Sequence, residues 1–263
     1  MTLLQVFDPL FRVPLANGLL LALVLPALGA YVRLRNEWLA ALGLAQVTAA
    51  GGVMAILVGI HPLAGSLGAA VLAAALKGRT ERSGNDVYAV LLFFGWSAAL
   101  LGAANSTRGE ELSHSLLEGQ LYFTTWANLG AAIALVAVVA FAGTWLSKRL
   151  LLEHFFPESL AANGQSPWKL HLAFDLLVAF SVALATESIG VMATFALVFL
   201  PPWIAFRIAA SWKRALVHCA GFSITAYLAA FVLAIVLDQP FGPVLVGTLV
   251  AGGIVLLPFR ARR

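Results

Sequence analysis

Charged residues are scarce in this sequence. Asp, Glu, Lys and Arg together make up 11% of its 263 residues, whereas the apolar residues AVILMFWYC make up 61%. An ordinary soluble domain contains roughly 25% charged residues, so this chain has too little polar surface to cover a water-soluble globule. The composition excludes a cytosolic enzyme and predicts a polytopic membrane protein.

The sequence also lacks the motifs of catalytic and redox proteins. Its single cysteine, Cys219, cannot form an intrachain disulfide or a Cys-x-x-Cys motif, and we expect a buried thiol. There is no G-x-x-x-x-G-K-[ST], no H-E-x-x-H and no G-x-S-x-G. We therefore expect that the chain is not an enzyme, binds no cofactor and does not hydrolyse ATP itself.

Long apolar segments dominate the chain. The predicted membrane spans are 13–32, 38–60, 63–76, 87–104, 125–146, 170–186, 189–206, 215–237 and 241–258. Because one crossing takes about 20 residues, nine crossings leave no room for a soluble domain. We predict an all-helical membrane protein with about nine transmembrane helices in a single domain, residues 1–263. In the short span 63–76, we expect Gly65, Gly68 and Ala69 to allow close helix approach.

The basic residues are distributed unevenly between the two sides of these spans. With nine crossings, all of the 16 Lys and Arg residues except Arg12 and Arg108 fall on one side. The positive-inside rule then places the N-terminus outside and the C-terminus in the cytoplasm. The net charge of +4 is spread in small groups between apolar segments, so it does not indicate nucleic-acid binding.

Two connections are longer than a turn requires. Residues 105–125 are predicted outside, and their portion LSHSLLEGQLYF is apolar enough to fold back into the bundle as a short helix. Residues 147–169 are predicted to form an amphipathic cytoplasmic loop, which is a natural docking surface. Between the spans 170–186 and 189–206, the polar residues before Gly190 predict a tight turn.

Several polar residues are candidates for function. Glu110, His114 and Glu118 have the i, i+4, i+8 spacing of one helix face, and these residue types suit zinc or manganese, although an exposed loop with this composition is also a common solvated surface. Glu187 interrupts an apolar run, so it is a candidate for a polar entrance. Gln46 and Thr48 could line a path or bond neighbouring helices.

Three aspartates lie near predicted span ends. Asp86, Asp175 and Asp238 are expected to anchor helices at the membrane interface or to cap helix ends.

Five stretches carry a resemblance to one family. VALATESIGVMATFALVFLPPWIAFRIAASWKRAL at 182–216 is similar to the pattern V-G-x-x-L-x-x-A-L-L-x-x-P-A-A-T-A-R. The others are LDQPFGPVLV at 237–246, FFPESLAANGQSP at 155–167, NDVYAVLLFFGWSAALLG at 85–102 and LLEGQL at 116–121. In order and spacing, they resemble the permease subunits of the zinc, manganese and iron ABC importers (ABC type 3).

The resemblance implies a type II ABC importer-like permease in a bacterial inner membrane. Such a permease forms a homodimer, receives solute from an extracytoplasmic solute-binding protein, and is driven by cytoplasmic ABC ATPase subunits that hold the ATP. By analogy, the ATPase-coupling residues would be Phe156, Pro157, Glu158, Pro201, Pro202, Arg207, Lys213 and Arg214. We expect Pro201-Pro202 to end one helix and to begin a coupling helix.

The chain departs from the family pattern where a metal would be held. The family's Asp and His of the second span align with Leu42 and Gln46, and its acid after Y-L-F-G aligns with Gln120. The candidate pathway residues are Gln46, Thr48, Glu118, Gln120 and Glu187. We expect import of a divalent metal, zinc or manganese. The alternatives are an ABC permease for a non-metal or chelated solute, and a self-sufficient secondary transporter.

Overall fold

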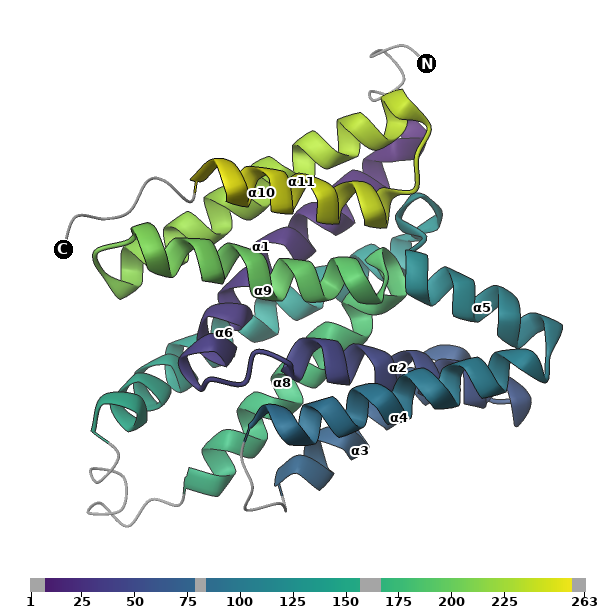
Figure 1. Cartoon of the computed structure of the whole chain (residues 1–263), viewed down its shortest axis with the longest axis horizontal. Helices are drawn as coiled ribbons and strands as arrows, with labels where there is room; N and C mark the ends of the chain where they lie inside the picture. The colour runs from purple at the N-terminus through teal and green to yellow at the C-terminus, as the bar shows by residue number, and fades with distance from the viewer. Residues whose placement is uncertain (1–7, 79–83, 157–166, 257–263) are drawn as a thin grey trace.

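The computed structural model describes residues 8–78, 84–156 and 167–256, whose regular structure is entirely helical (Figure 1). The elements are η2 (Pro9–Phe11), α1 (Arg12–Leu34), α2 (Ala40–Leu57), α3 (Pro62–Gly78), α4 (Asn85–Ala104), α5 (Thr107–Glu118), η3 (Leu121–Phe123), α6 (Trp126–Phe155), α8 (Pro167–Ile189), α9 (Val191–Ile208), α10 (Trp212–Leu237) and α11 (Phe241–Leu256). In these ranges seven helices are long and apolar enough to cross a membrane, and α3 and α11 are shorter apolar helices. This confirms the all-helical membrane fold, with nine crossings if both short helices cross.

Two helix boundaries differ from the sequence-based expectation. α6 continues to Phe155, through residues that we predicted to lie in the loop 147–169. α5 begins at Thr107 instead of near residue 112, because the Ser106 hydroxyl accepts a hydrogen bond from the backbone N–H of Gly109. At Gly119 the backbone has a φ of 84°, which ends the helix.

The tight turn between the sixth and seventh predicted spans is confirmed. α8 ends at Ile189 and α9 begins at Val191, and Gly190 between them has a φ of 85°. A residue with a side chain rarely adopts this conformation, so the glycine permits the sharp change of direction.

Small residues hold α2 between α3 and α4. A Cβ atom built on Gly95 of α4 would lie 2.5 Å from the backbone of Gln46, and one on Gly65 of α3 would lie 2.3 Å from the Gly51 carbonyl oxygen. These backbones can approach so closely only because no side chain intervenes. The expectation for Gly65 and Ala69 is therefore confirmed, whereas a Cβ on Gly68 would meet nothing within 4 Å.

The prolines of α9 do not end the helix, so our expectation of a coupling helix at that point was wrong. α9 runs from Val191 to Ile208 with Pro201 and Pro202 buried inside it. Proline at position 202 leaves the Val198 carbonyl without its helical N–H partner. That carbonyl packs against Gly29 of α1, where an added Cβ would lie 1.9 Å from the oxygen. α9 is therefore helical through its two prolines, although local helix propensity disfavours this, and it packs closely on α1 at the same point.

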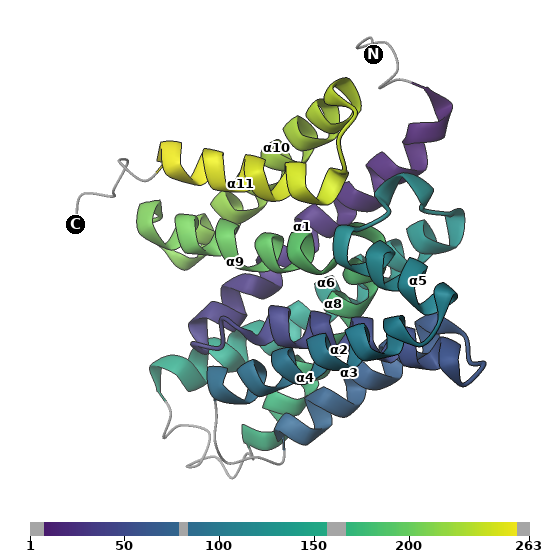
Figure 2. The ribbon, with the colours of Figure 1, turned by 45° about the vertical axis from the view of Figure 1, so that its right-hand side comes forward.

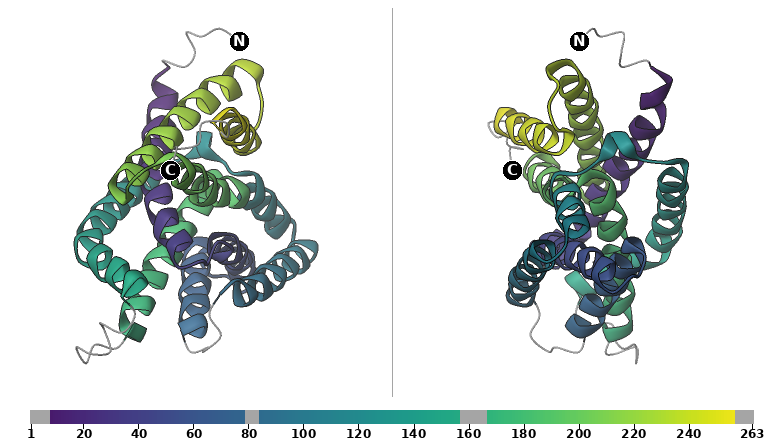
Figure 3. Two further views of the ribbon diagram at one scale, coloured as in Figure 1. Left: turned by 60° about the vertical axis from the view of Figure 1, so that its left-hand side comes forward. Right: turned by 90° about the vertical axis from the view of Figure 1, so that its right-hand side faces the viewer.

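The helix termini that carry most of the basic residues lie together, at the left and lower left of Figure 1. We call this the basic end: it comprises the last turns of α1, α3, α6 and α9 and the first turns of α8 and α10. The other side of the bundle is the opposite end. Figure 2 shows α10 and α11 as an antiparallel pair on one side of α9, with α2, α3 and α4 on the other. α6 lies at one edge of the bundle, across from α4 and α5 (Figure 3).

Candidate functional site

The two polar candidates of α2 are enclosed by the bundle. Gln46 is 7% exposed, and its Oε1 atom has no hydrogen-bond partner among the described residues. The Thr48 hydroxyl donates to the Leu44 carbonyl oxygen at 2.8 Å, so its donor is satisfied within α2. Of these two residues, Gln46 therefore has a hydrogen-bond acceptor available for a solute or for water.

The segment after α5 folds back into the bundle, as expected. A Cβ on Gly119 would lie 2.3 Å from the Ile189 carbonyl, so this chain crosses directly over the α8–α9 turn. Leu116 and Leu121 are buried on either side of this contact. Tyr122 packs edge-on against Phe11 with ring centroids 5.6 Å apart. The candidate Gln120 is exposed here, and the side chain of Glu118 lies outside the described residues.

Glu110 and His114 come together, as their spacing predicted. With Ser113 they line a cavity of about 390 Å³ between α4 and α5. Among the side chains that the structure describes, no group of three or more His, Cys, Asp or Glu is placed to hold a metal ion. Because the set proposed from the sequence includes Glu118, the metal site stays a prediction.

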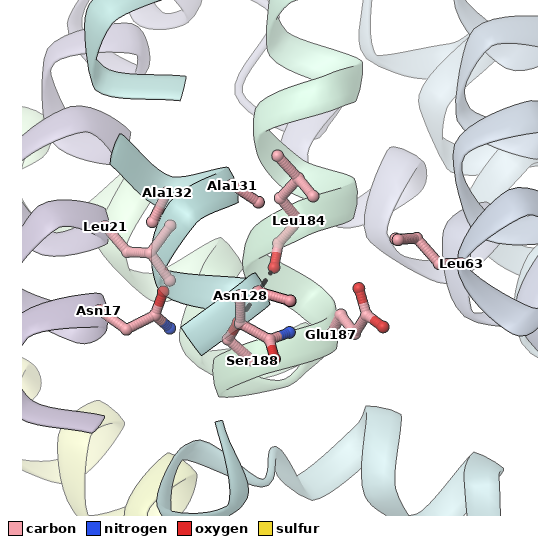
Figure 4. Close-up of a pocket in the computed structure, with 10 residues that line it drawn as sticks. Asn17, Leu21, Leu63, Asn128, Ala131, Ala132, Leu184, Glu187 and Ser188 are labelled. Carbon is pink, nitrogen blue, oxygen red and sulfur yellow. Dashed lines mark hydrogen bonds between the residues drawn. The ribbon is translucent and has the colours of Figure 1, made fainter. Parts of the chain in front are cut away.

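A small cavity of about 80 Å³ with several polar residues in its largely apolar wall lies at the opposite end, between α1, α3, α6 and α8 (Figure 4). Its polar lining residues are Asn17, Asn128, Glu187 and Ser188. The Asn128 Oδ1 atom accepts from the Thr125 backbone N–H at 2.9 Å, and the Ser188 hydroxyl reaches the Leu184 carbonyl at 3.4 Å. The structure thus places Glu187 beside this cavity, and its role in a solute pathway remains a prediction.

Asn17 is a polar residue of this cavity that the sequence reasoning missed. It is 1% exposed, and neither Oδ1 nor Nδ2 has a hydrogen-bond partner among the described residues. A buried amide without partners is costly, so it usually marks a place where water or a ligand binds. The signal was available, because Asn17 interrupts an otherwise apolar run.

Four charged side chains form a buried network at the basic end, which we call the charge quartet: Arg35, Glu37, Lys77 and Asp175. Arg35 Nη1 lies 2.7 Å from Asp175 Oδ1, and Arg35 Nη2 lies 3.2 Å from Glu37 Oε1. Lys77 Nζ lies 2.8 Å from Glu37 Oε1 and 2.7 Å from Asp175 Oδ2. Each cation therefore contacts both carboxylates, and the quartet joins the α1–α2 connection to α3 and α8.

The expectation for Asp175 was wrong, because it is neither an interfacial anchor nor a cap. It is 3% exposed, and its neighbour Phe174 lies under the guanidinium of Arg35, whose carbon is 5.2 Å from the ring centroid. Burial lowers the pKa of Arg35, but the charges of Asp175 and Glu37 outweigh this effect and raise the pKa above its ordinary value. By contrast, Asp86 is exposed in the first turn of α4, where its charge favours the helix terminus.

The elbow between α9 and α10 presents exposed basic residues. The Arg207 guanidinium carbon lies 4.2 Å from the centroid of the Trp203 ring, and Lys213 and Arg214 are exposed just after the helix cap at Ser211. Pro201 and Pro202 are buried within the chain, and their role in coupling stays a prediction.

At the end of α6, the candidate Phe156 is exposed, and the next two candidates, Pro157 and Glu158, lie outside the described residues.

The chain is similar to ABC transporter permeases in sequence pattern and in fold. The model of the ABC 3 transport family matches residues 7–259. PsaBC from Streptococcus pneumoniae, solved in complex with a Fab, superposes with a TM-score of 0.83 at 16% sequence identity, covering 97% of this chain and 94% of that chain. A metal-chelate type ABC transporter in an inward-facing conformation superposes with a TM-score of 0.75 at 16% identity, covering 93% and 84%. A comparison with curated proteins found no match.

Proposed function

Because the chain belongs to the ABC 3 transport family, we propose that this ABC permease carries a divalent metal ion, zinc or manganese, into the cell. The family match over residues 7–259 is the observation that carries the proposal, since it spans almost the whole chain. The metal-related solute is further supported by one structural neighbour, which is described as a metal-chelate type ABC transporter.

The proposed assembly contains two copies of this chain, two ATPase subunits at the basic end, and a solute-binding protein at the opposite end. ATP is hydrolysed on the ATPases, since the sequence has no Walker A motif. The exposed Arg207 at the end of α9 supports docking of an ATPase at the α9–α10 elbow. These partners fit a multi-span protein of a bacterial inner membrane.

In this proposal α9 acts as a lever. It runs from the elbow at Ile208 to the turn at Gly190, where Gly119 packs on the Ile189 carbonyl. Closure of the ATPases would push the elbow, and α9, which packs on Gly29 of α1 through the Val198 carbonyl, would transmit that push to the folded-back segment after α5. Such rigid-body motion of packed helices can switch the side to which a pathway opens.

The side chains available to the solute favour weak binding of a metal or passage of a chelate. Gln46 offers a neutral carbonyl oxygen, and Glu187 is the carboxylate of the cavity at the opposite end. A small divalent ion prefers several charged or imidazole ligands. For this reason a chelated metal is the second candidate solute.

The test is solute uptake by proteoliposomes that contain the permease with its ATPase and solute-binding protein. Elemental analysis should show zinc or manganese accumulating inside only when ATP and both partners are present. Accumulation of a ferric chelate in place of the free ions would favour the second candidate. If vesicles containing this chain alone accumulate metal against a gradient, the proposal is wrong and a self-sufficient secondary transporter remains.

The coupling role of the elbow can be tested with Arg207→Glu. Reversing this exposed charge should uncouple ATP hydrolysis from uptake while leaving expression unchanged, because Arg207 is exposed, stacks on Trp203 of its own helix and has a like charge, Arg33, nearby. Arg108→Glu, an exposed charge reversal at the opposite end, is the matched control. Equal coupling in both variants would reject the elbow as the docking site.

A further inference from the structure

An apolar groove of about 410 Å³ lies between α6 and the three helices α1, α8 and α10. Its walls include Ala27, Gly143, Phe174 and Leu216. The Tyr31 hydroxyl donates to the Ser147 hydroxyl at 2.7 Å across it, so the polar atoms of these two lining residues are satisfied within the protein. The remaining wall is suited to a hydrocarbon chain.

This groove opens toward the surroundings of the bundle. Of the seven helices long enough to cross a membrane, α6 is the least buried, and its Phe141 is 81% exposed beside the groove. A Cβ on Gly143 would meet nothing within 4 Å, so the groove is open at its middle. In a membrane protein such an outward apolar surface contacts lipid.

Unpaired cations lie at the basic end of the groove. Lys148 follows the lining residue Thr144 by four residues, and Lys213 precedes Leu216 by three, so each lies on the same helix face as a groove residue. Lys148, Lys213 and Arg214 are exposed, and none of them forms an ion pair with an acid among the described residues. Of the described acids at this end, Glu37 and Asp175 belong to the charge quartet, and Asp86 lies in the first turn of α4, which does not line the groove.

Glu153, a described acid of α6, is also paired, because its Oε1 lies 2.6 Å from His171 Nε2. The groove therefore combines a hydrocarbon-sized apolar cleft with cations at the level where lipid headgroups lie. Basic pockets between helices at a membrane surface bind anionic headgroups.

We propose that this groove binds an anionic phospholipid. One acyl chain lies along Gly143, and the phosphate headgroup is held by Lys148, Lys213 and Arg214. The charge complementarity distinguishes this occupant from a zwitterionic lipid, and from a second copy of the chain, which would bring the same cations to the interface.

The first experiment measures lipid selectivity of the full-length chain purified in neutral detergent. Phosphatidylglycerol and phosphatidylethanolamine with identical acyl chains are titrated, and bound lipid is counted by native mass spectrometry. Three cations near the headgroup, each contributing about fivefold, predict a preference for phosphatidylglycerol on the order of 100-fold. Equal binding of the two lipids would overturn the proposal.

The second experiment separates the headgroup from the acyl chain. Lys148→Gln with Lys213→Gln should weaken phosphatidylglycerol binding about 30-fold, while binding of phosphatidylethanolamine stays unchanged. Gly143→Trp should fill the groove and weaken both lipids. The matched controls are Arg108→Gln, an exposed cation at the opposite end, and Gly130→Trp on α6, where an added Cβ is equally unobstructed.

Two results would overturn the groove as the lipid site. The first is a loss of lipid binding in the controls as large as in the groove variants. The second is a Gly143→Trp variant that keeps its lipids but changes from dimer to monomer in light scattering, because a second copy would then be the occupant. Retained lipid binding without a change in mass would overturn the proposal as well.

Discussion

The two ends of α1, α3 and α8 hold their polar groups in opposite states. At the basic end, Arg35 and Lys77 of the charge quartet each contact the carboxylates of Glu37 and Asp175 at 2.7 to 3.2 Å. At the opposite end, Asn17 is buried beside a cavity of about 80 Å³, and its side-chain oxygen and nitrogen have no hydrogen-bond partner in the described part of the chain. The same helices are therefore joined by ion pairs at one end, whereas at the other end they contain a buried amide whose hydrogen bonds are not made within the described residues.

This difference indicates at which end water or a solute can enter and leave. Removing one member of a buried ion pair exposes its partner to a large desolvation cost, so the quartet holds its helices as a unit. Unpaired polar groups beside a cavity lose little when water or a solute enters or leaves. The opposite end is therefore suited to admit a solute, and the basic end is suited to transmit force.

The largest expected effect comes from breaking the quartet with Asp175→Asn. The variant leaves Arg35 and Lys77 with one carboxylate between them, which should lower the free energy of unfolding by about 3–5 kcal/mol. Denaturant titration in detergent, followed by tryptophan fluorescence, measures it. The double variant Lys77→Met with Glu37→Gln removes one charge of each sign and should be clearly less destabilised. Equal losses would show that the quartet is not a coupled unit.

A smaller effect, on transport and not on stability, is expected for Glu187→Gln. The side chain keeps its size beside the cavity but loses the charge that could attract a cation, so uptake in the reconstituted system should fall severalfold. The free energy of unfolding should change by less than about 1 kcal/mol, because Glu187 has no salt bridge among the described residues. A large loss of stability with normal uptake would show that Glu187, like the charge quartet, stabilises the fold and does not act in transport.

Asn17→Leu should stabilise the protein slightly. Replacing a buried amide that has no partners by an apolar side chain removes a desolvation cost of about 1 kcal/mol, and the neighbouring cavity accommodates the change in shape. The same denaturant titration detects this gain, with Asn128→Leu as a control that removes a bonded amide and should destabilise the start of α6. A marked loss of stability in Asn17→Leu would mean that ordered water satisfies its amide.

The last effect is a pH dependence at the opposite end, which is absent at neutral pH. Burial raises the pKa of Tyr122 in η3 to about 12 from the ordinary value of 10.0. The unfolded chain therefore loses this proton first, and stability falls as the pH rises from 10 toward 12. Tyr122→Phe should lose less stability over this interval than the wild type in a pH series of unfolding titrations. Parallel curves would show that the Tyr122 ring is solvated in the folded state.

Local sequence patterns predicted helix boundaries correctly where the conformation of one residue determines the boundary. Gly190 predicted the α8–α9 turn because only glycine readily adopts its φ of 85°. The pair Pro201-Pro202 misled us, because the rule that proline ends a helix is local, whereas α9 continues through the contact between Val198 and Gly29 of α1. Similarly, the length of α6 depends on its packing beyond residue 146 and is not visible in its hydropathy.

The candidate site was predicted less completely than the fold. Glu187 was identified because a carboxylate in an apolar run is unusual, and Glu110 with His114 because helical spacing brings them together. Asp175 was misassigned since its position near a span end suggested an anchor. Its partners Arg35 and Lys77 are 140 and 98 residues away in sequence, so no local pattern pairs them.

The sequence by itself determined that this chain is a helical membrane protein and in what order its helices follow, because hydrophobicity and glycine conformation act over a few neighbouring residues. The tertiary structure alone decided which charges neutralise one another, which amide is left unpaired, and where an apolar groove meets unpaired cations. Those outcomes depend on distances between side chains from helices that are remote in sequence, and such distances are fixed only when the helices pack.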